Sequence, residues 1–393
     1  MKRPIYLDHH ATTPVDPRVV EAMAPYWTED FGNPSSSTHA YGWRAEAAVE
    51  VARETLAEAI GAADPSEIVF TSGTTESDNL ALAGRVRRVA NAHLVTTAIE
   101  HPAVLDTARA LASEGAHLVE LPVDGAGRVD PSRVADALTP ETQLVSVGAA
   151  NSEIGTIQPL AEIAAVCRDA GVPFHSDAAQ AVGKVPLDVG AAGIDLLSFC
   201  AHKVYGPKGI GALYLRGAGR NPRLAPQLHG GGHERGLRSG TLPVPLIVGF
   251  AEAVRIAVAE LATEVERLAG LRERLWALLR EKLPGVQRNG SDAHRLPGNL
   301  HVSFPGVDAG MLLGALHDVA LSAGSACASA RGEPSHVLQA IGLSAEALRG
   351  ALRFGIGRGN TADDIDRAAE RVIEEAERAR VPGGGARQVA RGG

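Results

Sequence analysis

The spacing of apolar residues along the chain predicts helices that alternate with buried strands. Between residues 43 and 60 apolar side chains recur every three or four residues, which predicts a helix that stops at Gly61. Helical patterns also occupy 102–113 and 160–170, with short apolar runs typical of strands between the helices. The predicted strands are 67–71, 93–99, 117–121, 143–149, 173–177, 195–200 and 209–215.

This repetition of strand, helix and strand predicts an α/β fold. Its seven strands should form a mainly parallel sheet that is covered by helices on both faces. In such sheets ligands bind where the carboxyl ends of the strands turn into helices. Several of the polar stretches discussed below lie at those predicted ends.

The pattern changes after residue 257, where a second and smaller α+β domain is expected. A long helix is predicted over 258–283, followed by strands over 299–304 and 352–356. Thr361 and Asp364 would cap the last helix as an acidic form of the capping box. The N-terminal strand over residues 5 to 7 could join either domain. The predicted domains are 14–257 for the large one, 1–13 with 258–380 for the small one, and 381–393 for a disordered Gly-rich tail.

Composition narrows the classes of function. Apolar residues form 45% of the chain, charged residues form 21%, and the formal net charge is -8. This mild acidity offers no basic surface for direct contact with nucleic acid or for a membrane surface. Neither a signal peptide nor a membrane span is expected from the sequence. The three cysteines, Cys167, Cys200 and Cys327, lack metal-ligand spacing and favour a reducing compartment, so we expect no metal and a cytoplasmic protein.

Two polar stretches follow predicted strands and have two interpretations each. The stretch TSGTTESDN at 71–79 opens a helix, so its backbone N–H groups could bind a phosphate. Ser, Thr and Gly at that place are more often simple caps. In HSDAAQ, Asp177 could be a solvated turn residue or a buried anion that keeps a pyridine nitrogen protonated.

Two further stretches contain possible nucleophiles. Lys203 in CAHKVYGPKG comes directly after an apolar strand, where lysine is unusual. Desolvation would lower its pKa and free the amine to form a Schiff base. Cys327 in SAGSACASA has only small neighbours, as expected of an accessible loop thiol or of a tightly packed turn. That stretch alone favours the turn.

Taken in order, these stretches closely resemble the class V aminotransferase family of pyridoxal-phosphate (PLP) enzymes. Within that family the resemblance is to the cysteine desulfurases of the NifS/IscS kind. It runs from Tyr6 to about Arg358 and implies PLP fold type I, with a large and a small domain. The matching motifs are YLDHHATTP, GNPSSSTH, TSGTTESDN, EHPAV, NSEIGTIQP, HSDAAQ, AHKVYGPKG, GGGHERGLRSGTLP, and GSACASA followed by EPSHVL.

The resemblance implies a role for each residue around the cofactor ring. Lys203 would carry PLP as an internal aldimine and then move protons. Asp177 would pair with the ring nitrogen, and Gln180 would hydrogen-bond the phenolic oxygen. His101 would stack on the ring face and, as a third catalytic residue beside Lys203 and Cys327, move protons. The residues assigned to the phosphate are Thr74, Thr75, Cys200, His202 and, from the other subunit of a homodimer, Thr241.

The resemblance also implies a substrate, L-cysteine, and a reaction. Arg353 would clamp the substrate carboxylate bidentately, with Asn33 and Asn151 nearby. The thiolate of Cys327 would attack the substrate sulfur, retain it as a persulfide and release L-alanine. The stretch ASARGEPSHVL matches the subgroup with a long catalytic loop, whose usual sulfur acceptors are iron–sulfur scaffold proteins and tRNA-thiolation enzymes.

Two departures from the family pattern affect these expectations. Cys200 stands where the family usually has a serine that binds the PLP phosphate, and a thiol is a weaker donor. The tail after residue 380 does not resemble the extension that docks a scaffold protein, which leaves iron–sulfur assembly and dedicated thiolation both open.

Other activities remain as alternatives. Selenocysteine lyase or another class V reaction would use the same fold. Cys327 argues against a transaminase, which needs no thiol there. A non-catalytic scaffold is less favoured, because Lys203, Asp177 and Cys327 are all present.

Overall fold

The computed structural model describes residues 3–218, 224–324 and 335–380. Its largest element is a sheet of seven strands in the order β2-β8-β7-β6-β5-β3-β4. β8 runs antiparallel to both of its neighbours, and the other strands of the sheet run parallel to one another. This confirms the predicted α/β class. The strands are β2 (Ile68–Thr71), β3 (His93–Thr97), β4 (His117–Leu121), β5 (Thr142–Ser146), β6 (Phe174–Asp177), β7 (Leu196–Cys200) and β8 (Gly211–Leu215).

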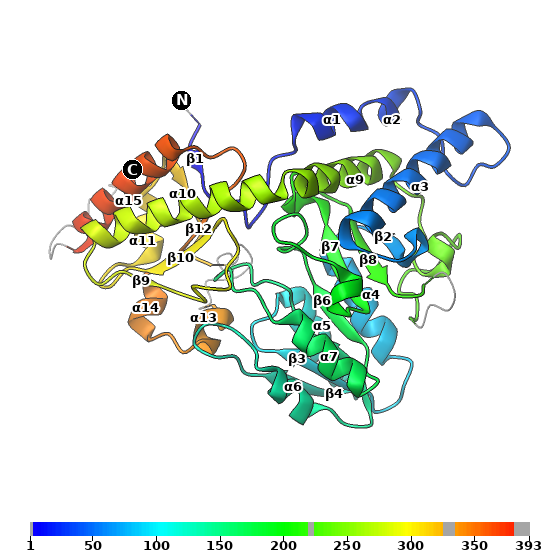
Figure 1. The fold of residues 1–393 in the computed structure, drawn as a ribbon, viewed down its shortest axis with the longest axis horizontal. Coiled ribbons are helices and arrows are strands. Elements are labelled where there is room, and N and C mark those ends of the chain that lie inside the picture. The colour runs from blue at the N-terminus through cyan, green and yellow to red at the C-terminus, as the bar shows by residue number, and fades with distance from the viewer. Residues whose placement is uncertain (1–2, 219–223, 325–334, 381–393) are drawn as a thin grey trace, which may run out of the picture.

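Helices cover both faces of this sheet (Figure 1). Its central strands bury apolar side chains against the helices on each side. One apolar core joins the sheet to α3 (Ala40–Ile60), α7 (Leu160–Asp169) and α9 (Val244–Ala259). The other core joins it to α4 (Thr74–Val86) and α5 (Pro102–Ser113). The remaining helices of this part are α1 (Pro17–Met23), α2 (Pro25–Thr28), α6 (Pro131–Ala137) and α8 (Val189–Ala192).

The end of α3 and the start of α15 follow the predicted local chemistry. Gly61 adopts φ of +71° after α3, a left-handed conformation that lets the backbone close the helix. At the start of α15 (Ala362–Arg380) the Asp364 N–H donates to Thr361 Oγ1 over 3.1 Å, and the Thr361 N–H donates to Asp364 Oδ2 over 3.0 Å. The acidic capping box is therefore confirmed.

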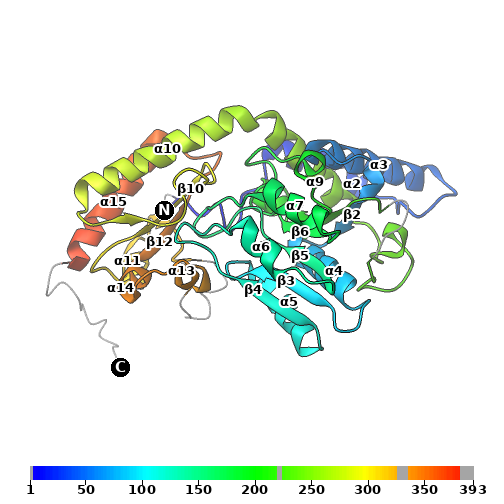
Figure 2. The ribbon, with the colours of Figure 1, turned by 60° about the horizontal axis from the view of Figure 1, so that its bottom comes forward.

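A separate apolar core lies in the second part of the molecule (Figure 2). It packs α10 (Leu261–Lys282) and α15 against a three-stranded sheet of order β12-β10-β9. The N-terminal strand β1 (Ile5–Tyr6) pairs in parallel with β11 (Val319–Ala320), so it lies with this part. The other elements here are β9 (Gln287–Arg288), β10 (Asn299–Ser303), β12 (Ala351–Gly355), α11 (Ala309–Ala315), α13 (His336–Ala340) and α14 (Ala345–Arg349).

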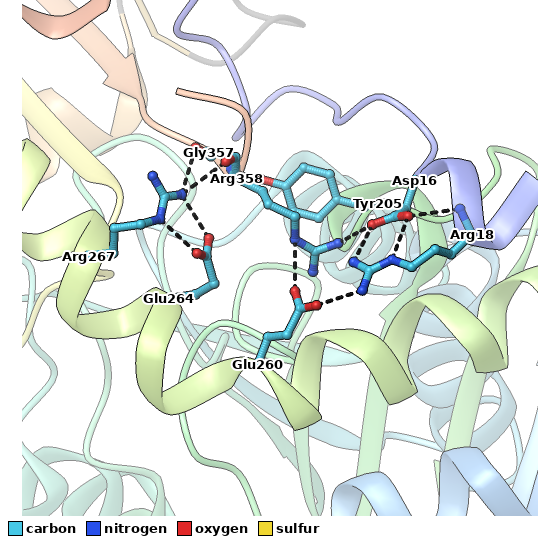
Figure 3. Close-up of polar contacts among 8 residues, drawn as sticks. All are labelled: Asp16, Arg18, Tyr205, Glu260, Glu264, Arg267, Gly357 and Arg358. Atoms are coloured by element: carbon cyan, nitrogen blue, oxygen red, sulfur yellow. Dashed lines mark hydrogen bonds and ion pairs between the residues drawn. The ribbon is translucent and has the colours of Figure 1, made fainter. Parts of the chain in front are cut away.

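An ion-pair network joins the two parts beside the long helix α10 (Figure 3). The Asp16 carboxylate accepts from Arg18 Nη2 over 2.8 Å and from Arg358 Nη1 over 2.6 Å. Arg358 also lies over the Tyr205 ring, 4.4 Å from its centre, and its N–H donates to the Tyr205 hydroxyl. Hydrogen bonds from Arg18 lower the pKa of Asp16 to about 2, so the network stays charged at neutral pH. Tyr205 lies two residues after Lys203, and Arg358 lies three residues after the end of β12. Their contacts therefore anchor the segment after Lys203 to the segment that follows the three-stranded sheet.

Within the residues that the structure describes, no helix is both long enough and apolar enough to span a membrane. Cys167 and Cys200 are both buried and unpaired.

Candidate active site

A pocket of about 580 Å³ lies at the carboxyl ends of β6 and β7, between the large sheet and Arg353 on β12. Ligand sites of open α/β sheets occur at this edge. Ten predicted site residues line the pocket: Thr74, Thr75, His101, Asn151, Asp177, Gln180, Cys200, His202, Lys203 and Arg353.

Two of the predicted residues that the structure describes lie elsewhere. Asn33 is exposed in the loop after α2, where its Oδ1 accepts from the Ser35 N–H over 2.9 Å. Thr241 is exposed before α9. Neither of the two lines the pocket within one chain. Cys327 lies outside the described residues.

Lys203 enters the pocket from the short turn that follows β7. Its Nζ donates to the carbonyl oxygens of His10 and Ala11, over 2.7 Å in each case. Burial lowers the pKa of Lys203, because the ammonium is partly removed from water and faces only neutral oxygens at short range. A lowered pKa makes the free amine more accessible as a nucleophile for a carbonyl carbon.

Asp177 ends β6 within a group of buried acids. Its Oδ1 accepts from the Ala179 N–H over 2.9 Å. Burial raises the pKa of Asp177. Burial, and then the charge of Asp177, raise the pKa of Asp78 well above its usual range, and burial raises that of Glu100 to about 7. A nearby cation would stabilise the charged, carboxylate form of such buried acids. A protonated ring nitrogen beside Asp177 would be such a cation.

His101 is the N-cap residue directly before α5 and is exposed at the pocket. Its Nδ1 accepts the Ala103 N–H over 3.1 Å and so caps the helix. A neutral ring with Nδ1 as acceptor carries its proton on Nε2. In this state His101 donates from Nε2. Its Nδ1 could accept a proton only after the hydrogen bond from the Ala103 N–H is broken.

The opposite end of the pocket fits a phosphate. Gly73 precedes α4 with φ of +155°, and α4 begins without a side-chain cap, which leaves the first-turn N–H groups of Thr74 and Thr75 to meet an anion. Thr12 Oγ1 lies 3.2 Å from His202 Nδ1 and fixes that ring. Burial, assisted by Lys203, lowers the pKa of His202 to about 4, so the ring is neutral.

Cys200 lies at this end of the pocket as the last residue of β7. Its side chain is buried, and burial raises the pKa of its thiol. The group therefore stays protonated at neutral pH and can offer only a weak S–H donor.

Arg353 and Asn151 keep free donors at the side of the pocket. The buried Arg353 donates from Nη2 to Asp8 over 2.8 Å and from Nη1 to the Ser152 carbonyl over 2.9 Å, while its buried Nε has no partner. A guanidinium has five N–H donors, so some remain for a carboxylate. Asn151 Nδ2 donates to the Ile99 carbonyl over 2.9 Å, which leaves its second hydrogen.

Sequence reasoning missed several residues in or next to this pocket. His10 and Glu100 line it, and so does His336, whose Nε2 lies 2.9 Å from the Glu100 carbonyl oxygen. Lys184 approaches Gln180 from behind. Glu100 and His336 belong to motifs that carried the resemblance, but neither had a pattern of its own that marked it.

Comparisons with known proteins show which family the chain belongs to. A family model described as aminotransferase class-V matches residues 5–368. The chain is 52% identical over 384 residues to "Cysteine desulfurase IscS" of Anaeromyxobacter sp. (strain Fw109-5), covering 97% of this chain and 94% of that protein. A solved structure titled "NIFS-LIKE PROTEIN" has a TM-score of 0.88 and 37% identity, covering 94% of this chain and 98% of the other. Another, titled "SspA in complex with cysteine", has a TM-score of 0.80 and 40% identity, covering 89% and 98%.

Proposed function

This chain belongs to the aminotransferase class-V family, and we propose that it is a PLP-dependent cysteine desulfurase that converts L-cysteine to L-alanine. The carrying observation is the placement of Lys203, with its lowered pKa, in one pocket with Asp177 and an uncapped helix N-terminus. When bound, PLP would withdraw electrons from the substrate's Cα.

The pocket residues would hold the cofactor at three places. Thr74, Thr75 and His202 bind the phosphate, and Gln180 donates to the phenolic oxygen. Asp177 holds the proton at the ring nitrogen, a charge-assisted hydrogen bond in a partly desolvated place. The ring would be oriented before substrate arrives, because Asp177, Gln180 and His202 are already fixed by hydrogen bonds. The Thr74 hydroxyl is buried without a partner and is available to the phosphate.

The substrate would lie between the two parts of the molecule. Arg353 and Asn151 bind its carboxylate, which places its Cα close to the amine of Lys203. Lys203 then removes and returns the proton at that carbon. Free L-cysteine is the substrate, and cleavage of selenocysteine by the same groups is the alternative.

Sulfur transfer is assigned to Cys327. Its thiolate bonds to the substrate sulfur, and the substrate Cβ–S bond breaks with its electron pair remaining on Cβ. A proton then completes the methyl group of alanine, and the sulfur stays on Cys327 as a persulfide. A protein acceptor, an iron–sulfur scaffold or a thiolation enzyme, receives it. Because the thiol must stay reduced between turnovers, we assign the enzyme to the cytoplasm.

We also assign the active form to a homodimer of two-domain subunits. Thr241 and Asn33 lie outside the pocket of their own chain, so they are free to serve a partner's pocket. Large apolar side chains gather on α2, α3 and the loop between them, with Trp27 58%, Phe31 63% and Trp43 56% exposed. Such a patch is typical of a subunit interface. The two domains are 14–257, and 1–13 with 258–380.

The direct test is to incubate the yellow holoenzyme with L-cysteine and a thiol reductant and to quantify alanine and sulfide. We expect both to accumulate in equal amounts. L-Serine, which has the same shape without sulfur, should give no alanine. Absence of alanine from L-cysteine would contradict the proposed function.

Replacing Cys200 by serine should strengthen PLP binding. A serine hydroxyl is a better donor to a phosphate than a thiol, and a gain of about 1.4 kcal/mol corresponds to about tenfold tighter binding. The measurement is the dissociation constant of PLP by fluorescence titration of the apoenzyme. Cys167→Ser is the matched control, because Cys167 is buried on α7, away from the pocket. Unchanged or weaker binding in Cys200→Ser would refute this role of Cys200.

A further inference from the structure

Lys184 is a partly buried amine for which the reaction above has no use. It lies four residues after Gln180, in the turn that follows β6, and its Nζ donates to Gln180 Oε1 over 2.6 Å. This is the closest polar contact that the structure gives the Lys184 side chain, and it joins the residue to a side chain of the cofactor pocket. A lysine is rarely placed this way without a function.

The contacts around Gln180 determine which way its side-chain amide points. An ammonium group only donates, so the atom that faces Lys184 must be the amide oxygen. A backbone carbonyl only accepts, so the atom 2.9 Å from the His10 carbonyl oxygen must be the amide nitrogen. Lys184 and the His10 backbone therefore fix the same orientation independently.

The His10 ring is consistent with that orientation. His10 Nδ1 lies 3.1 Å from Gln180 Oε1 and must donate its proton to that oxygen. The other ring nitrogen, Nε2, is buried and has no partner, as expected of a bare lone pair. Burial lowers the pKa of His10 well below its usual value, which agrees with a neutral ring.

We infer that Lys184 is a positioning residue, which fixes the Gln180 amide so that its second Nε2 hydrogen points at the phenolic oxygen of the cofactor. The inference rests on the proposed function, because it requires PLP in the pocket. Without Lys184 the amide keeps only its contacts with His10 and loses the 2.6 Å bond to Oε1, so the orientation that points Nε2 at the phenolic oxygen is held less firmly. Burial lowers the pKa of Lys184 to about 7, and below that pH its ammonium also polarises the Gln180 amide and so strengthens the donated hydrogen bond.

This arrangement should affect the acid–base behaviour of the bound cofactor. A firm donor at the phenolic oxygen, with a positive charge behind it, stabilises the deprotonated form of the cofactor's lysine adduct. Lys184 thereby keeps the pKa of that adduct low. The titratable or charged groups that face Lys184 or share the cavity behind it are His9, His10, Cys200, His202, Lys203, Glu264, Arg353 and Arg358.

The test follows the visible absorption of the bound cofactor as a function of pH in the holoenzyme. In Lys184→Met the midpoint of the absorption change should rise by about 1 pH unit. Lys282→Met, which removes an exposed lysine of α10, should leave the midpoint unchanged. An unchanged midpoint in Lys184→Met would overturn the inference.

A second background separates positioning from a direct effect of charge. If Lys184 acts through Gln180, the shift caused by Lys184→Met should largely disappear when Gln180 is already alanine. An equal shift in both backgrounds would mean that Lys184 acts by charge alone, and the positioning role would be wrong. Thermal unfolding of each variant shows whether it is folded.

If Lys184→Met does not fold, Lys184→Gln gives the same test. Its side-chain N–H can still donate to Gln180 Oε1, so its midpoint should rise by less than half a unit, while a shift as large as the full unit would overturn the inference. Failure of the proposed function is distinct from either outcome, because the wild-type protein would then show no cofactor absorption to titrate.

Discussion

Lys203→Ala should lose at least about 10³-fold of the rate of alanine formation. The substitution removes the amine that holds the cofactor and moves the proton at the substrate's Cα. Lys203 faces the carbonyl oxygens of His10 and Ala11, and no other lysine is described at that place. The measurement is the turnover rate, together with borohydride reduction of the wild-type enzyme and mapping of the modified peptide.

Two further lysines make the mapping decisive. Lys208 lines the same pocket, and Lys184 lies behind Gln180. Borohydride should fix the cofactor to Lys203 alone. Lys282→Ala serves as the control, because Lys282 is exposed on α10 and pairs with Glu281. Wild-type turnover in Lys203→Ala, or modification of Lys184 or Lys208, would contradict the assignment.

Asp177→Asn should retain the fold but lose about 10²–10⁴-fold in turnover. An amide cannot hold a proton on the ring nitrogen as a carboxylate does, and breaking a buried ion pair costs about 3–5 kcal/mol, which converts to that loss in rate. Turnover should fall without a comparable change in KM, because Asp177 is assigned to the ring and not to the substrate.

The control for Asp177→Asn is Asp363→Asn, which makes the same change at an exposed position of α15. The outcome that would argue against the role of Asp177 is a rise in KM alone with full turnover. Both variants replace a carboxylate by an amide of the same size, so neither removes buried apolar area. An equal loss of thermal stability in the two variants would therefore carry no information about catalysis.

The large sheet could be predicted because each of its strands is a short apolar run followed by a turn or helix signal. The antiparallel direction of β8 could not be read from its residues, because a strand buried on both faces has the same composition in either direction. The helix α9 was also missed. Its sequence is apolar on nearly all sides and has no amphipathic pattern, although it packs against α3 in the core.

In the site, too, some residues could be predicted from the sequence and others could not. Asp177, Gln180 and Lys203 were predicted from motifs and Arg353 from the family resemblance, and the structure brings them to one pocket. Lys184 was not predicted, because its contact depends on how the turn after β6 folds back beneath Gln180. His10 acts partly through its backbone carbonyl, which has no signature in sequence. Residues that support others are thus found only from the three-dimensional contacts.

If the chain moves sulfur from cysteine onto Cys327, a single turnover with L-cysteine, without reductant or acceptor, will leave the sulfur on that residue. We expect one alanine per subunit and the mass of one added sulfur atom on the peptide that contains Cys327, with both absent in Cys327→Ser. Alanine formation at the wild-type rate in Cys327→Ser, or sulfur on the peptide of Cys167 or Cys200, would contradict this expectation.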